Sequence, residues 1–125
     1  MGKETENWWH QAEADFKAAV FNFNGKQYYV ASFLFQQAVE KALKALMLKE
    51  KKELLKSHSL SRLAKELNTP LALLAKLAIL EPVYQETRYP DVSEKIPAEE
   101  FEEEDASKFL EIAEEVMQWI RKRIK

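Results

Sequence analysis

The chain has no cysteine among its 125 residues, which excludes disulfide bonds, thiolate nucleophiles and most zinc sites. Gly2 and Gly25 are its only glycines, so no glycine-rich loop exists to cradle a phosphate group. The two histidines, His10 and His58, lie in no His-Glu-x-x-His or Glu-x-x-His pattern and in no nucleophile elbow. We therefore expect no metal ion, no cofactor and no serine-hydrolase chemistry.

Long apolar runs are also missing. None approaches the roughly 18–20 residues that a membrane-spanning helix needs. The start, MGKETENWW, lacks an apolar stretch behind a basic one, which excludes a secretory signal and predicts a cytoplasmic protein. With 46% hydrophobic and 32% charged residues, the chain is typical of one globular domain over 1–125. The net charge of -2 excludes no class of partner, and the many Lys and Glu residues with so few glycines favour a heat-stable, thermophilic source.

What is present is a helical period. Apolar residues recur at steps of three and four, which predicts long helices over about 4–24, 27–50 and 103–124. Gly25 is expected to end the first helix in a left-handed conformation. The second helix is apolar over about half its circumference and should lie at the centre of the fold. Phe33 and Met47 fall outside that apolar arc, which suggests a second contact such as a subunit interface.

Between the second and last long helices, the sequence contains residues that typically begin or end helices. Ser57 or Ser59 is the expected N-cap of a short helix, SLSRLAKEL. Thr69 is then expected to cap a fourth long helix that begins with Pro70. That helix starts with LALLAKLAIL, which is apolar nearly all round, so we expect deep burial. Pro82 should kink or restart it.

These elements predict an all-α fold, an up-and-down antiparallel bundle of four long helices plus one short helix. Pro90 and Pro97 are expected to flank a loop, DVSEKI. The last helix begins with EEFEEED and ends with RKRIK, charges that complement the helix dipole at both ends. A nucleic-acid patch is the less favoured interpretation of the basic end.

A polar and aromatic segment, YQETRYPD, follows the apolar run and brings together Tyr84, Arg88 and Tyr89. It is either an ordinary helix terminus or a site. His58 opens the short helix and either packs near its start or has a functional role. Lys41 belongs to the polar side of the second helix, with Glu40 among its neighbours, and this side is either a solvated face or part of a site.

The segments FLFQQAVEKALKALMLKE, HSL and YQETRYPD, with WWHQAEADFKAA before them, resemble the HEPN (higher eukaryotes and prokaryotes nucleotide-binding) domain family. The resemblance covers essentially the whole chain. It implies a bundle of four or five helices and a homodimer. It also implies a nucleotidyltransferase partner in a toxin–antitoxin-like pair, and a nucleotide or RNA as ligand.

The catalytic branch of the family consists of RNA endonucleases with an arginine followed after four to six residues by a histidine. Here YPDVSEKIP follows Arg88, without a histidine, so we assign no catalytic residue. The resemblance implies a non-catalytic protein whose ligand-binding residues are Arg88, Tyr89, Tyr84, His58 and Lys41. Arg88 would contact phosphate, while Tyr84 or Tyr89 would stack on a base or donate a hydrogen bond.

Two alternatives stay open. In a structural or adaptor dimer, Arg88 would pair with an acidic group such as Asp15 or Glu40. In a diverged RNase toxin, His58 would replace the missing histidine, because an imidazole can transfer a proton while an arginine stabilises charge on phosphate.

Overall fold

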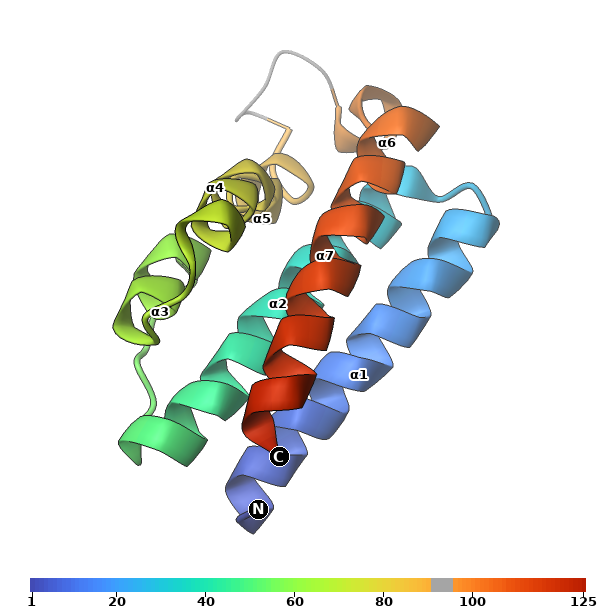
Figure 1. Ribbon diagram of the computed structural model, residues 1–125. Helices are drawn as coiled ribbons and strands as arrows, with labels where there is room; N and C mark the ends of the chain where they lie inside the picture. Colours follow the sequence, from blue (N-terminus) through green and yellow to red (C-terminus); the bar gives the residue numbers. More distant parts are fainter. Residues whose placement is uncertain (91–95) are drawn as a thin grey trace.

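The computed structural model describes residues 1–90 and 96–125, and the regular structure of these residues is entirely helical (Figure 1). The helices are α1 (Lys3–Asn24), α2 (Tyr28–Lys51), α3 (Leu60–Glu66), α4 (Leu71–Leu80), α5 (Val83–Glu86), α6 (Pro97–Glu100) and α7 (Glu103–Ile124). The predicted all-α bundle is therefore confirmed. Most of the expected loop DVSEKI lies outside the described residues.

Three long helices, α1, α2 and α7, form the body of the bundle. A short turn joins α1 to α2 as an antiparallel hairpin, and α7 runs in the direction of α2 (Figure 1). Arg123 near the end of α7 donates from Nε to Oε2 of Glu50 near the end of α2, over 2.7 Å. Helices α3, α4 and α5 lie together on the side of α2 away from α1 (Figure 1).

The central position predicted for α2 is confirmed, because both faces of this helix are covered. Its buried apolar residues are Ala31, Phe35, Ala38, Val39, Ala42, Leu43, Ala45, Leu46 and Met47. Met47 is only 2% exposed, so the second contact predicted for it lies within the chain and not at a subunit interface. Phe33 is half-buried against residues of the same chain.

The deep burial predicted for the fourth long helix is wrong. Leu71 at the start of α4 is 82% exposed, and Ile79 is also exposed. One face alone, carrying Leu73, Leu77 and Leu80, packs into the core. The reason is position, since α4 lies at the edge of the bundle against α3 and α7 and its outer side faces solvent.

Proline and capping residues set the ends of the shorter helices. Pro82 ends α4 and precedes α5, as predicted for a restart. Ser59 is the N-cap of α3, because its side chain accepts a hydrogen bond of 3.2 Å from the backbone N–H of Arg62. Thr69 does not cap α4. Its hydroxyl donates to the carbonyl of Ala64 over 2.8 Å and so completes the end of α3.

In the turn after α1, the left-handed residue is not Gly25 as predicted. Gly25 has a φ of −84°, whereas Lys26 adopts the left-handed conformation with a φ of 63°. The N–H of Lys26 bonds to the carbonyl of Phe23 over 3.0 Å, and the N–H of Gln27 bonds to that of Asn22 over 2.8 Å. These two bonds form a Schellman motif, which places its left-handed residue one position beyond the C-cap.

Candidate functional site

The polar centre of the molecule is the carboxylate of Glu40 on α2, which is only 4% exposed. Its Oε1 accepts a bond of 3.2 Å from Nε2 of Gln36. Its Oε2 lies 3.0 Å from Nζ of Lys44 and 3.0 Å from Nδ1 of His58. A buried carboxylate needs such partners, because an unpaired charge away from water is costly. One interpretation of this side of α2 was a face exposed to solvent. That interpretation is wrong at Gln36, Glu40 and Lys44, which are buried.

Glu40 also orients His58. The carboxylate oxygen can only accept, so the Nδ1 atom facing it carries the proton. In the neutral imidazole, Nε2 is then left as an acceptor. The His58 side chain is 61% exposed, so a ligand can reach the ring.

A set of rings surrounds Arg88. The imidazole of His58 stacks on Tyr84 with ring centroids 4.6 Å apart and planes inclined by 18°. The guanidinium carbon of Arg88 lies 4.8 Å from the ring centroid of Tyr84 and 5.4 Å from that of Tyr89. Phe33 adds a third ring at 5.9 Å. We call Phe33, His58, Tyr84, Arg88 and Tyr89 the Tyr84 cluster.

The local chain explains this arrangement. Tyr84 and Arg88 are four residues apart, and residues at this spacing lie on the same side of a helical turn. Helix α5 ends at Glu86, but the helical winding continues into Arg88, whose N–H bonds to the carbonyl of Gln85 over 3.1 Å. The side chain of Arg88 therefore folds back along Tyr84, and cation–π attraction favours that position.

Four of the five predicted site residues thus come together: Tyr84, Arg88, Tyr89 and His58. Lys41 does not, because its Nζ lies 2.5 Å from Oδ2 of Asp15 on α1. The pairing of Arg88 with Asp15 or Glu40 that an adaptor role suggested is also absent. Within the described residues, Asp15 bonds to Lys41 and Gln11, and Glu40 bonds to Gln36, Lys44 and His58.

A cavity of about 420 Å³ opens beside the Tyr84 cluster. Its walls include His58, Tyr84, Glu81 and Glu86. Oε1 of Glu81 accepts bonds of 2.7 Å from Oγ of Ser59 and 3.0 Å from the N–H of Ser61, and this joins the end of α4 to the start of α3. Partial burial, followed by the charge of Glu100, raises the pKa of the Glu86 carboxyl.

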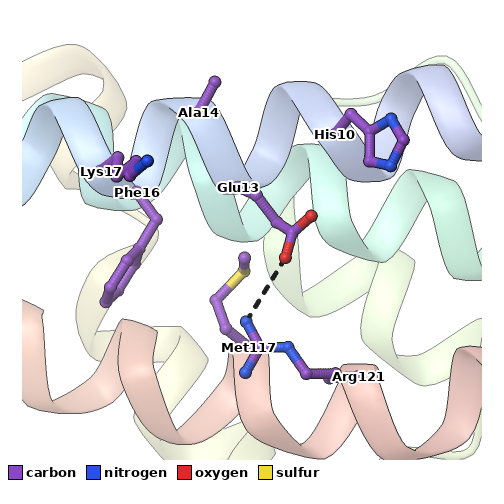
Figure 2. A pocket seen from close by; sticks show the side chains of 7 residues that line it. All are labelled: His10, Glu13, Ala14, Phe16, Lys17, Met117 and Arg121. Atoms are coloured by element: carbon purple, nitrogen blue, oxygen red, sulfur yellow. Dashed lines mark ion pairs between the residues drawn. The ribbon is translucent and has the colours of Figure 1, made fainter.

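A second cavity, of about 490 Å³, lies between α1 and α7 (Figure 2). Figure 2 shows Glu13 and Arg121 pointing toward each other, with Met117 close to them. Their charged atoms are 3.7 Å apart, and the Arg121 guanidinium also lies 5.6 Å from the centroid of Trp9. His10 on this rim is exposed. Because its arginine already faces a carboxylate, this cavity offers an anion a less available guanidinium than that of Arg88.

Over residues 1–90 and 96–125, no three His, Asp or Glu side chains gather closely enough to hold a metal ion. No helix in the same part of the chain has the length and apolar character to cross a membrane. The features that sequence reasoning missed are the central role of Glu40 and the contribution of Glu81 to the cavity. The Gln36–Glu40–Lys44 spacing was a usable signal for the first, because it places three polar groups on one side of a helix.

The fold and site define a small all-helical bundle protein with a buried polar centre beneath an exposed arginine and aromatic cluster. The HEPN domain family model matches residues 5–124, and the chain belongs to this family, as the sequence segments predicted. ST0689, described as an archaeal HEPN homologue, is 36% identical in sequence, with a TM-score of 0.85 and full coverage of both chains. TT1696 from Thermus thermophilus is 25% identical, with a TM-score of 0.89, covering 97% of this chain and 98% of that one. A search of curated proteins finds no match.

Proposed function

We propose that this HEPN protein binds a nucleotide, or the backbone of an RNA, at the Tyr84 cluster, and that it acts by binding without catalysing a reaction. The observation that carries the proposal is the state of Arg88. The residue is exposed, its guanidinium lies against aromatic rings, and no carboxylate of residues 1–90 and 96–125 pairs with it.

Aromatic rings hold a guanidinium in place without neutralising it or taking up its N–H donors. A guanidinium held in this way is suited to bidentate contact with a phosphate group. A base can stack on Tyr89, which is 43% exposed, or on the outer face of His58. Tyr84 is less available for stacking, because its ring already contacts His58 and Arg88.

The proposal extends to the assembly. The working unit is a homodimer that acts beside a nucleotidyltransferase, as a toxin–antitoxin-like pair. Membership of the HEPN family supports this extension. Light scattering of the purified protein should give twice the chain mass, and a monomer at micromolar concentration would contradict it.

Replacing Arg88 tests the binding site directly. Because the loss of a charge-assisted contact costs about 1.5–3 kcal/mol, Arg88→Ala should weaken binding of ATP or a short single-stranded RNA by tenfold or more. Isothermal titration calorimetry measures this. Arg62→Ala removes an exposed arginine of α3 that belongs neither to the Tyr84 cluster nor to the walls of the adjoining cavity, so it is the control and should bind as the wild type does.

The same variant separates binding from an adaptor role. The unfolding free energy of Arg88→Ala should fall by no more than about 1 kcal/mol, since the side chain is exposed and cation–π contacts at exposed sites contribute about 0.5–1 kcal/mol. Equal nucleotide binding by wild type and variant, together with a sharp loss of stability or of the dimer, would favour the adaptor and refute the proposal.

A second candidate function is RNA cleavage by His58. The observation in its favour is the Glu40 carboxylate 3.0 Å from Nδ1, because a carboxylate in this place fixes the tautomer and orientation of an imidazole that moves a proton. Cleavage of single-stranded RNA should then disappear in His58→Ala and persist in His10→Ala. A wild-type protein that leaves the RNA intact would rule this function out.

A further inference from the structure

The cavity beside the Tyr84 cluster presents hydrogen-bond acceptors. In the neutral imidazole of His58, Nε2 is an acceptor when Nδ1 donates to Glu40. Among the described residues, Glu81 bonds through Oε1 to Ser59 and Ser61, which leaves Oε2 for a ligand. Glu86 adds a second carboxyl group to the wall. A ligand that fills this space must therefore bring donors.

The carboxylates also decide where a phosphate can lie. Like charges repel at close range, so Glu81 and Glu86 disfavour an anion inside the cavity. Arg88 lies outside, and its guanidinium carbon is 4.8 Å from the ring of Tyr84. The same tyrosine lines the cavity, so a cationic group and an acceptor-lined space both adjoin one side chain.

We propose that this cavity binds the amino-bearing edge of a nucleobase, so that the protein prefers adenine and cytosine nucleotides to hypoxanthine and uracil nucleotides. The inference rests on the proposed nucleotide binding at Arg88 and adds the class of base. The phosphate lies on Arg88, and the exocyclic amino group donates to Oε2 of Glu81 and Nε2 of His58.

Two other kinds of ligand that acceptors could bind, a metal ion and a cationic side chain, fit this cavity less well. A metal ion needs several ligands that converge on one point, and the described residues hold no such group of His, Asp and Glu. A lysine or arginine side chain of a partner protein would satisfy the carboxylates but would be repelled by Arg88. A nucleotide carries the phosphate and the amino group in one molecule, and a cavity of about 420 Å³ is within the usual size for such ligands.

Matched pairs of nucleotides test the inference. In AMP and CMP this edge carries an amino donor beside a ring nitrogen that accepts, whereas in IMP and UMP it carries a carbonyl oxygen beside a ring N–H, so the acceptor-lined cavity would face that oxygen. A correct hydrogen-bonded base edge contributes about 1–3 kcal/mol of discrimination, so AMP should bind the full-length protein about tenfold or more tightly than IMP. CMP should be preferred to UMP in the same way. Isothermal titration calorimetry gives all four affinities.

Two variants identify the acceptors. Glu81→Gln keeps the oxygen that Ser59 and Ser61 use and replaces the other with an amide donor, so the preference for AMP should vanish or reverse. His58→Phe keeps a ring on Tyr84 but removes Nε2, so the preference should shrink while binding still depends on Arg88. Glu66→Gln, an exposed residue of α3, is the control and should keep the wild-type preference.

The outcomes separate this inference from the function on which it rests. Equal affinity for AMP and IMP and for CMP and UMP, with binding still lost in Arg88→Ala, refutes the base preference alone. A preference that survives unchanged in both Glu81→Gln and His58→Phe refutes this cavity as its source. Failure of the wild type to bind any of the four nucleotides refutes both proposals.

Discussion

Glu40 is the residue that joins stability to the site. Its carboxylate neutralises Lys44, which is only 7% exposed, and holds His58 in one orientation. Removing one partner of a buried ion pair leaves the other charge uncompensated, at a cost of about 3–5 kcal/mol. The ring of Trp8, with its centroid 5.5 Å from Nζ of Lys44, compensates for part of this loss. We therefore expect Glu40→Ala to lose about 3 kcal/mol of unfolding free energy in urea denaturation.

Two further variants make that expectation specific. Glu114→Ala removes an exposed carboxylate from α7 and should change stability by less than about 0.5 kcal/mol. The double variant Glu40→Leu with Lys44→Met should recover most of the loss, since an apolar pair of similar volume can replace a buried ion pair. If Glu40→Ala unfolds at the same urea concentration as Glu114→Ala, the ion pair does not stabilise the fold.

At the scale of helices, the sequence predicts the long ones well and the environment of the short ones poorly. An apolar stripe repeated over about six turns leaves little ambiguity, so α1 and α7 were placed within a residue or so of their observed ends. Helix α4 has no polar face to indicate its solvent side. Its burial depends on which helices pack against it, which is a property of the fold and not of the segment.

The candidate site likewise has one part that the local sequence predicts and another that only the fold determines. Tyr84, Arg88 and Tyr89 are neighbours in sequence, so their grouping was predictable from local geometry. The contributions of His58 and Glu81 depend on the pairing of α3 with the end of α4, about 20 residues away in the chain. Lys41 was misplaced because adjacent helical residues point about 100° apart. With Glu40 directed at His58, its neighbour Lys41 faces Asp15 on α1.

At the scale of the whole molecule, α2 is the helix that contacts both the other long helices and the group α3–α5. It packs against α1 and α7 and also against α3 and α5, so its side chains belong to one common core. A core of this kind is expected to unfold in a single cooperative transition, because the detachment of any helix from α2 exposes apolar surface of the remaining helices. The Tyr84 cluster rests on α2 through Phe33, so its geometry depends on the same packing.

Leu46 and Leu71 test this view as a matched pair. Leu46 on α2 is fully buried, so Leu46→Ala should lose about 2–5 kcal/mol and lower the Tm by roughly 10 °C or more. Leu71→Ala removes the same atoms from the exposed start of α4 and should change stability by less than about 0.5 kcal/mol. Calorimetry and near-ultraviolet circular dichroism should report one coincident transition for each. Two separate transitions in Leu46→Ala would show instead that α3–α5 unfold independently of the three long helices.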